Sequence, residues 1–223
     1  IQSVSIIHEN NPFNIDAAGG AVVWAEKFGI KVHSIVDYTP GRTAHEDLLR
    51  RADLNADTAL IVCAYPDEGH AILQALSGAR QQPAAVCMTI APIHPMFAIK
   101  AGEIAEGVFA PSQWEPEERI PYPGTREFIA AFRELTRVQP SYHAGSAYAT
   151  GQVFSRAIQA TNSLDNGVLR DYIAAMDTVT VIGRFKVDNH GKQIGHNPIL
   201  IQWQDKKKEI VYPFRLQTAE PIF

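Results

Sequence analysis

Ala59-Leu60-Ile61-Val62-Cys63 is apolar at every position. A strand with one solvent-facing side alternates polar and apolar residues, whereas an unbroken apolar run is typical of a strand covered on both faces. Residues 84–88, which read Ala-Ala-Val-Cys-Met, form a second run of this kind. These two stretches therefore predict a sheet that lies between two layers of helices.

The segments on both sides of these runs alternate between strand and helix patterns. Further strands are predicted at residues 4–7, 31–36 and 107–110, and helices at 15–28, 43–54, 67–79 and, after a loop with Pro92 and Pro95, in a short stretch ending near 105. Pro12 suits a first helical turn, Gly29 a helix end and Thr43 a helix cap. Five strands that alternate with four helices indicate a parallel, doubly wound α/β sheet.

The organisation changes near Pro116. Three helices are predicted without strands between them, at 125–137, 142–162 and 165–176, with Thr125 as the cap of the first. Strand patterns return at 179–182, 185–187, 199–203 and 209–214, and a charged hairpin tip at 205–208 joins the last two. We therefore expect an α/β block at 1–116, a helical segment at 117–178, and return strands at 179–223 that add to the first block.

Composition excludes several classes of protein. The 223 residues are 46% hydrophobic and 20% charged, which is enough apolar surface for a core, so intrinsic disorder is excluded. The net charge of −4 argues against a nucleic-acid binder, and no apolar run reaches the roughly 20 residues of a membrane span. Cys63 and Cys87 have neither a disulfide-framework nor a zinc spacing, and we expect both as buried thiols.

The chain lacks the sequence motifs of several enzyme classes. It has no Gly-x-Ser-x-Gly elbow, no phosphate loop ending in Gly-Lys-Ser/Thr, and no Gly-x-Gly-x-x-Gly after the first strand. The loop at residues 8–14 is polar and aromatic rather than glycine-rich, so no nucleotide cofactor is expected. His70 and His94 lack a His or carboxylate partner four residues away, so we predict neither a metal site nor a catalytic residue.

The ends of the predicted strands carry aromatic and amide side chains instead. In a doubly wound fold, ligands bind beyond the carboxyl ends of the strands. Phe13, Tyr65 and Trp114 follow such strands and would form flat apolar walls, and oriented hydrogen bonds would come from Asn11, Ser112 and Gln113. This pattern favours a binding cleft without a nucleophile and base; the alternative is that the aromatic side chains only fill the loop ends.

The order of several short segments is also informative. They are Val4-Ser5-Ile6-Ile7 through Asn11-Pro12-Phe13, Phe28-Gly29-Ile30-Lys31-Val32, Tyr65-Pro66, Ala105-Glu106-Gly107-Val108, Pro140-Ser141-Tyr142 with Ala147-Tyr148, Val181-Ile182-Gly183 with Phe185, Asp188 and Gly191, and Gln202-Trp203. In this order and spacing the chain resembles the type I periplasmic solute-binding proteins of branched-chain amino acid ABC transporters, a family that includes relatives that bind aromatic acids.

The resemblance implies two α/β lobes, joined by three crossovers, that close on a small molecule. Residues 1–116 look like the second lobe, the helical segment like a returning part of the first lobe, and residues 179–223 like the return to the second. The opening sheet of the first lobe has no counterpart, so the chain looks like the C-terminal portion of such a protein. The aromatic faces of Phe128, Phe132 and Tyr148 would then lack the sheet that they normally cover, and two alternatives remain open: self-association with another copy through this segment, or irregular packing.

The resemblance also assigns ligand contacts. In amino-acid-binding members, the aromatic residue after the first strand of this lobe and the tyrosine of the Tyr-Pro element line the cleft. The matching residues here are Phe13 and Tyr65, the latter followed by Pro66. Tyr142 opens the second helix of the helical segment and would either approach the cleft or pack in the core.

The residues after the fourth strand bear on the kind of ligand. Members that hold an α-amino group place an acidic residue there, where this chain has Thr89 and Ile90. A buried ammonium group without a carboxylate partner is very unfavourable. The resemblance therefore implies an aromatic or otherwise apolar carboxylate, stacked on Phe13, Tyr65 or Trp114.

The expected function is that of an extracytoplasmic solute-binding component of an ABC importer, which catalyses no reaction and works in the periplasm with a membrane permease. Ligand would favour a closed arrangement of the lobes. Two alternatives remain open. A ligand-sensing regulator or receptor domain of the same fold would pass closure to another partner. A flavodoxin-like α/β enzyme would need a catalytic pair, for which Asp67, His70 and His94 are the candidates.

Overall fold

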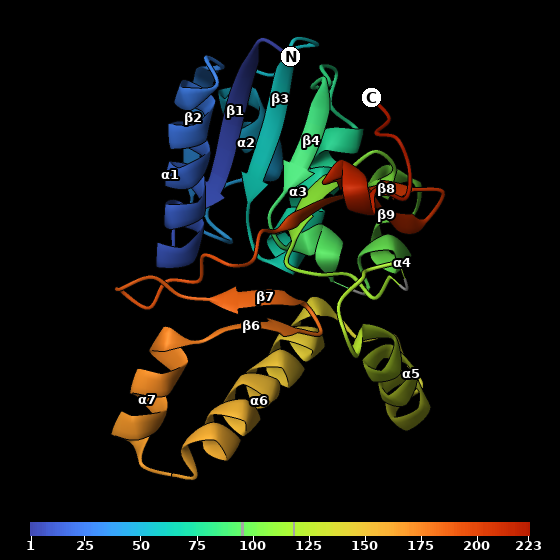
Figure 1. The fold of residues 1–223 in the computed structure, drawn as a ribbon. Helices are drawn as coiled ribbons and strands as arrows, with labels where there is room; N and C mark the ends of the chain where they lie inside the picture. The colour runs from blue at the N-terminus through green and yellow to red at the C-terminus, as the bar shows by residue number, and fades with distance from the viewer. Residues whose placement is uncertain (95, 118) are drawn as a thin grey trace. The chain divides into compact units, whose positions relative to one another are not determined.

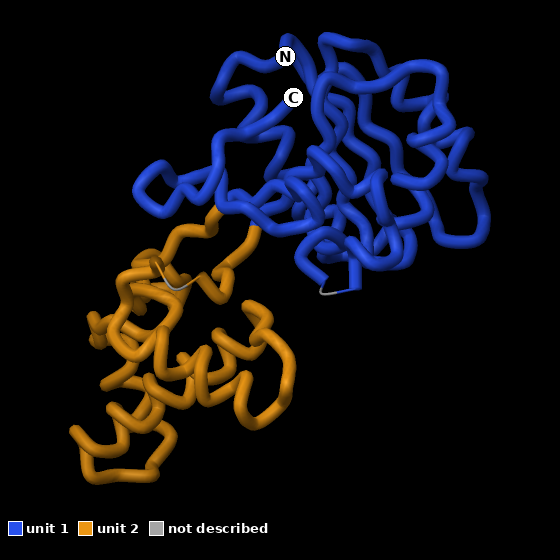
Figure 2. The backbone as a smooth tube through the Cα atoms, turned by 90° about the vertical axis from the view of Figure 1, so that its right-hand side faces the viewer, with its two compact units in different colours: residues 1–111, 200–223 blue, residues 112–199 orange. Residues whose placement is uncertain are grey.

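The computed structural model describes residues 1–94, 96–117 and 119–223, and the chain divides into two compact units. Unit 1 comprises Ile1–Pro111 and Leu200–Phe223, and unit 2 is Ser112–Ile199 (Figure 2). Pro95, predicted in the loop before the short fourth helix, lies outside the described residues. Each unit has its own apolar clusters.

Unit 1 is built on a seven-stranded sheet with the strand order β2-β1-β3-β4-β5-β8-β9 (Figure 1). The strands are β1 (Ser3–Glu9), β2 (Lys31–Tyr38), β3 (Thr58–Cys63), β4 (Ala85–Met88), β5 (Phe109–Ser112), β8 (Ile199–Gln204) and β9 (Lys207–Tyr212). The strands β1 to β5 pair in parallel, and β8 and β9 are antiparallel. The predicted doubly wound, mainly parallel α/β fold is therefore confirmed.

Helices cover both faces of this sheet. They are α1 (Pro12–Lys27), α2 (His45–Ala52), α3 (Pro66–Ser77) and α4 (Phe97–Ala101), with short 3-10 helices η1 (Ala91–Ile93), η2 (Gly102–Ala105) and η3 (Phe214–Leu216). α1 packs on one face of the sheet, and α2 and α3 pack on the other (Figure 1). The connection from β1 to β2 crosses the sheet in one direction, and those from β2 to β3 and from β3 to β4 cross it in the other. Right-handed connections in opposite directions place their helices on opposite faces. The continuous apolar character of residues 59–63 in β3 follows, because side chains on both faces of this strand, such as Val62 and Cys63, are buried.

α1 begins three residues earlier than predicted. Asn11 is its N-cap, and the side-chain Oδ1 of Asn11 accepts a hydrogen bond of 3.0 Å from the backbone N–H of Asn14. Pro12 occupies the first helical position, where its missing N–H is not needed and its fixed φ suits the helix. These two residues place Phe13 in the first turn, directly beyond β1.

Two predicted helix caps are wrong. Ala44, not Thr43, precedes α2, and it provides no side-chain cap. Thr125 is the first residue of α5 (Thr125–Thr136), and Gly124 precedes it with a φ of 82°, a left-handed conformation that favours glycine. The buried Thr125 hydroxyl donates instead to the carbonyl of Val181 at 2.6 Å, so it links α5 to the segment after β6.

The described residues of unit 2 form three helices and a separate hairpin. Its remaining elements are α6 (Tyr142–Thr161), α7 (Asn166–Ala175), β6 (Asp177–Thr180) and β7 (Gly183–Lys186). β6 and β7 form their own two-stranded antiparallel sheet. The expectation that residues 179–223 all add to the first block is therefore wrong for this hairpin, because Val181 and Phe185 pack into unit 2 clusters; only β8 and β9 join the large sheet.

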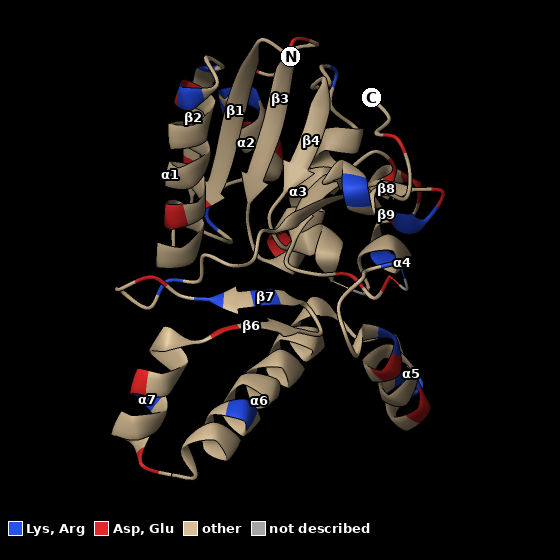
Figure 3. Ribbon diagram, in the orientation of Figure 1, with Lys and Arg blue, Asp and Glu red and all other residues tan. Residues whose placement is uncertain are grey.

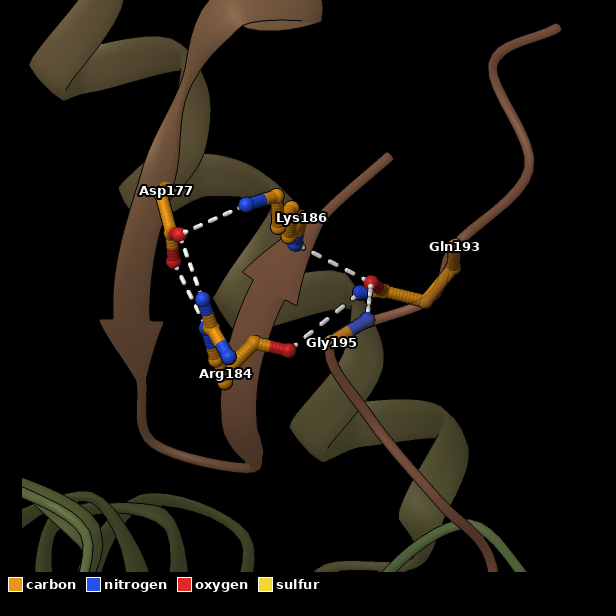
Figure 4. Close-up of polar contacts among 5 residues, drawn as sticks. All are labelled: Asp177, Arg184, Lys186, Gln193 and Gly195. Carbon is orange, nitrogen blue, oxygen red and sulfur yellow. Dashed lines mark hydrogen bonds and ion pairs between the residues drawn. The ribbon is translucent and has the colours of Figure 1, made fainter. Parts of the chain in front are cut away.

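A polar network fixes the β6–β7 hairpin (Figure 4). Arg184 donates from Nε and Nη2 to the two carboxylate oxygens of Asp177, at 2.7 and 2.5 Å, and Lys186 Nζ donates to Asp177 Oδ2 at 3.2 Å. The Gln193 side-chain oxygen accepts from the backbone N–H groups of Lys186 and Gly195, at 3.0 and 2.8 Å. The hydrogen bonds from Arg184 and Lys186 hold the pKa of Asp177 well below its ordinary value.

The aromatic side chains of unit 2 cover one another. Phe128 is buried, and its ring centroid lies 4.7 Å from that of Tyr148, 5.9 Å from that of Phe132 and 6.0 Å from that of Trp114. The Phe128 face is therefore covered within unit 2. Tyr148 remains half exposed.

The two cysteines are free and contribute to unit 1 as small apolar side chains. Cys63 is buried at the end of β3 and Cys87 is partly buried in β4. Burial raises the pKa of both thiols to about 12, so both are protonated and unreactive at neutral pH. Within the described residues, no helix combines the length and the apolar character that crossing a membrane requires.

Candidate functional site

The topology of unit 1 singles out one place on the sheet. From β1 the chain passes through α1 to β2 on one side, and the next strand, β3, lies on the other side of β1. A doubly wound sheet opens a crevice beyond the carboxyl ends of two strands that diverge in this way. The loops that follow β1 and β3 therefore flank the candidate site, and they lead into the first turns of α1 and α3.

Two exposed aromatic side chains meet at this place. Phe13, in the first turn of α1, is 53% exposed, and Tyr65, immediately before α3, is 47% exposed. Their rings are stacked, with centroids 6.4 Å apart and an interplanar angle of 19°. The structure thus brings together two of the three predicted aromatic walls, and they offer a flat apolar surface to a ligand.

The backbone around Tyr65 is held by groups from β1 and α3. Pro66 occupies the first position of α3, which fixes the direction in which the chain leaves β3. The Tyr65 N–H donates to Glu9 Oε2 at 3.4 Å, and Glu9 ends β1. The aromatic pair therefore stands on rigid element ends rather than on a long loop.

Buried polar atoms without hydrogen-bond partners gather at the same edge. Among the described residues there are eight such side-chain atoms, and six of them lie at the carboxyl ends of β1 to β4 or in the helical turns that follow: Asn11 Nδ2, Asn14 Nδ2, Asn14 Oδ1, Tyr38 OH, His70 Nδ1 and Thr89 Oγ1. Such atoms are rare in folded proteins, because leaving them unpaired is unfavourable. Their concentration indicates an edge that binds water or a polar ligand group.

Asn14 and Tyr38 are candidate site residues that the sequence patterns do not indicate. Asn14 has no exposed surface, and Tyr38 is buried at the end of β2, next to Glu9 in the β1–β2 register. Burial, with the carboxylates of Glu68 and Glu9 nearby, raises the pKa of Tyr38 well above its ordinary value. Its hydroxyl therefore stays protonated and can donate. A tyrosine two residues beyond the strand predicted at 31–36 is the only signal that the sequence offers.

The charges at this edge are arranged unequally between the two helices. The first turn of α3 contains Asp67 and Glu68, whereas the first turn of α1 contains no acidic residue. Glu68 is already engaged, because its Oε2 lies 3.2 Å from His45 Nε2. The positive end of the α1 dipole therefore lacks a compensating acid and favours an anionic group.

Thr89 and Ile90 continue the edge beyond β4. The Thr89 N–H donates to the Val62 carbonyl at 3.0 Å, which extends the β3–β4 pairing by one residue. Ile90 is half buried and precedes η1. The stretch after β4 thus presents a hydroxyl and an apolar side chain, with no carboxylate in either position.

The three residues considered for an enzyme, Asp67, His70 and His94, line one small cavity of about 240 Å³ beside this edge. Asp67 forms an ion pair of 3.1 Å with Lys100, and the backbone N–H of Met96 donates to His94 Nδ1 at 3.2 Å. Two of the three thus have structural partners. Among the described residues, no group of three or more His, Cys, Asp or Glu side chains is arranged to hold a metal ion.

Trp114 and Tyr142 belong to unit 2. Trp114 is only 1% exposed and packs in a cluster with Phe128, Ile129 and Val181. The expectation of an exposed Trp114 wall is therefore wrong, because the indole is a core side chain. Tyr142 packs against the same cluster, and burial raises its pKa.

The two polar residues predicted beside Trp114 also serve unit 2. Ser112 is buried, and its hydroxyl contacts the Trp114 carbonyl and Glu115 Oε1, at 3.0 and 2.9 Å. The Gln113 carbonyl accepts from His196 Nε2 at 2.7 Å. Gln113 and His196 border a largely apolar cavity of about 370 Å³ between α6 and the hairpin, which the sequence reasoning did not predict.

Comparison with known proteins gives a consistent picture. A family model described as periplasmic binding protein matches residues 1–208. The structure is similar to that of a putative branched-chain amino acid ABC transporter from Silicibacter pomeroyi, with a TM-score of 0.82 and 15% identity over 99% of this chain and 60% of that one. A second such protein, from Rhodospirillum rubrum, has a TM-score of 0.75 and 19% identity over 94% and 60% of the two chains.

A third similar structure contains a ligand. It is an ABC transporter substrate-binding protein from Desulfitobacterium hafniense in complex with Leu, with a TM-score of 0.74 and 18% identity over 94% of this chain and 60% of that one. The chain therefore spans about 60% of the length of these structures.

Proposed function

The chain belongs to the periplasmic binding protein family, and from this premise we propose that it is the solute-binding part of an ABC importer. It binds a small molecule at the carboxyl edge of unit 1, works in the periplasm, and passes its ligand to a membrane permease without catalysing a reaction. The observation that carries this proposal is the stacked, exposed pair of Phe13 and Tyr65 at the point where β1 and β3 diverge.

The unpaired polar atoms around this pair support a ligand with a polar end. Asn11 and Asn14 offer amide donors at the first turn of α1, and Tyr38 and Thr89 offer hydroxyls. A carboxylate near α1 would satisfy amide donors and meet the uncompensated positive end of the helix dipole. The apolar part of the same ligand would lie against the rings of Phe13 and Tyr65.

We propose an aromatic or otherwise apolar carboxylate as the ligand, rather than an α-amino acid. The stretch after β4 provides Thr89 and Ile90 where an ammonium group would need an acid, and Glu9 and Glu68 already have partners in Tyr65 and His45. The competing candidate is leucine, which is bound in the similar structure from Desulfitobacterium hafniense.

A thermal-shift screen of benzoate-like acids against leucine and valine tests the ligand class, followed by calorimetric titration of the hits. We expect aromatic acids to raise the melting temperature and the branched-chain amino acids to leave it unchanged. A clear shift with leucine or valine and none with aromatic acids would reject the ligand class while leaving the binding role in place.

Side-chain truncation tests the site itself. Phe13→Ala and Tyr65→Ala should each weaken binding about ten-fold, because each removes one stacking surface. Phe214→Ala is the matched control, since Phe214 is an exposed aromatic residue of unit 1 that pairs with Tyr212 and follows β9, the last strand in the sheet order. Equal affinity for wild type and both site variants would contradict the proposed site.

A further inference from the structure

The outer face of α1 has the character of an interface. α1 is apolar over most of its length, and its only charged residues are Asp16, Glu26 and Lys27 (Figure 3). A helix that covers a sheet on one side and faces water on the other normally shows a polar outer face. On the outer side of α1, Val23 is exposed and Trp24 is 56% exposed, and the Trp24 ring stacks on that of Phe28 at 5.8 Å.

Gly19 and Gly20 interrupt this exposed face. Both lie inside the helix, where glycine is less favourable than alanine. A Cβ atom added to either would meet no atom of the chain within 4 Å, and both have ordinary helical φ values. Neither the packing of unit 1 nor its backbone geometry therefore requires glycine, whereas the close approach of a second helix would.

The spacing of these residues makes the face complementary to itself. Asp16, Gly20, Val23 and Lys27 follow one another at intervals of four, three and four residues, which places them on one stripe of the helix. When two copies of α1 cross antiparallel about the midpoint between Ala21 and Val22, residue 16 of one lies level with residue 27 of the other. In the same way, residue 20 of one copy lies level with residue 23 of the other, and residue 19 lies level with residue 24.

We propose that this outer face of α1 is a dimerisation surface, on which α1 of a second copy of the chain packs antiparallel. In the pair, Val23 and Trp24 of each copy fill the space left by Gly19 and Gly20 of the other. The Asp16 carboxylate of each copy meets the Lys27 ammonium of the other. The interface is isologous, as a two-fold symmetric dimer requires.

The free chain already holds these groups on the face. Lys27 Nζ lies 4.4 Å from the centroid of the Trp24 ring, so a cation–π contact keeps the ammonium group beside the Trp24 side chain. Charge complementarity between Asp16 and Lys27 selects the antiparallel pairing, because a parallel pairing in register would oppose like charges. A single helix pair is a small interface, so we expect a dimer that dissociates on dilution.

Sedimentation of the 223-residue chain over a wide range of concentration, at low and high salt, tests the proposal. We expect a concentration-dependent dimer, weaker at high salt. Gly20→Leu should weaken it by about ten-fold or more, because a leucine there keeps the helices apart. Gly151→Leu is the matched control: Gly151 is an exposed glycine within α6 whose Cβ would also meet nothing, and this variant should dimerise like the wild type.

Charge reversal tests the orientation of the pair. Asp16→Lys and Lys27→Asp should each weaken the dimer, and the double variant should recover it, because the opposite charges then meet again. A chain that stays monomeric throughout, a dimer that Gly20→Leu and Gly151→Leu affect equally, or a double variant no stronger than the single ones would overturn the proposal. Ligand binding is measured separately, so these outcomes do not depend on the proposed function.

Discussion

The Asn14 side chain has no exposed surface, and neither its Nδ2 nor its Oδ1 has a partner within the described residues. Folding alone would favour an apolar side chain of the same shape. We expect Asn14→Leu to raise the free energy of unfolding by about 1–3 kcal/mol, since it removes an unpaired buried amide.

The same substitution should weaken ligand binding, because it removes donors from the α1 end of the site. Chemical denaturation and calorimetric titration of one variant measure both effects. A variant that is less stable than the wild type would show that the Asn14 amide serves the fold and not the site.

Asp177 carries a second prediction at the scale of one residue. Its pKa is depressed in the folded chain by hydrogen bonds from Arg184 and Lys186. A depressed carboxyl pKa contributes stability that is fully present above the pKa of the unfolded chain and is lost as the pH falls toward the folded value. Asp177→Asn should therefore lower the stability at pH 7 slightly, and the difference from wild type should shrink below about pH 4.

Urea unfolding at several pH values measures this effect. Asp171→Asn is the control, because Asp171 also pairs with an arginine but with its sequence neighbour Arg170, whereas Asp177 joins β6 to two basic residues of β7. A difference between Asp177→Asn and wild type that stays constant down to low pH would contradict the assignment.

Some site residues could be recognised in the sequence and others could not, for a physical reason. Phe13 and Tyr65 follow strands directly, so the sheet geometry alone places them at the carboxyl edge. Trp114 also follows a strand, but its indole packs on the helices of unit 2, and sequence position does not reveal such a tertiary contact. Asn14 is polar and sits in a helix, where a pattern of apolar residues cannot show that it faces inward.

At the scale of elements, α3 depends on a close contact made by Gly69. A Cβ at this position would lie 2.9 Å from the Cβ of Ala91 and 3.2 Å from Cε of Met88. Gly69→Ala should therefore lower the free energy of unfolding by about 1–3 kcal/mol, despite the better helix propensity of alanine. Gly151→Ala, in open space on α6, should instead gain up to about 1 kcal/mol. Denaturant midpoints of the two variants that move in the same direction would contradict this reading.

The elements that could be predicted are those whose own residues decide them. The runs at β3 and β4 are apolar throughout because both faces are covered, and that property is visible in the sequence. The hairpin of β6 and β7 was recognised as strands but assigned to the wrong unit. The unit to which the hairpin belongs is decided by where Val181, between the two strands, and Phe185, in β7, pack, and two apolar side chains fit either core.

At the scale of the whole molecule, two compact units with separate apolar clusters predict more than one unfolding transition. Gly69→Ala should lower the midpoint of the unit 1 transition. Thr125→Val should lower that of unit 2, because it leaves the buried carbonyl of Val181 without its donor. Differential scanning calorimetry of both variants and of the double variant measures the two midpoints. Equal displacement of a single transition by both substitutions would mean that the chain unfolds as one unit.

Unit 1 is built from two separate segments, Ile1–Pro111 and Leu200–Phe223, and this affects how the chain folds during synthesis. β5 lies between β4 and β8 in the sheet. The Trp203 carbonyl of β8 accepts a hydrogen bond from the Gly107 N–H at 2.9 Å, and the Trp203 N–H donates to the Val108 carbonyl at 3.0 Å. The Trp203 indole N–H donates to the Pro92 carbonyl at 2.8 Å. A ribosome releases β5 long before β8, because all of unit 2 lies between them. Until β8 is made, β5 is an unpaired edge strand, and the contacts of Trp203 with Gly107, Val108 and Pro92 are missing. A chain in this state is prone to aggregation. We therefore expect the yield of folded protein to depend more on the speed of synthesis and on access to chaperones than on the free energy of unfolding of the finished chain.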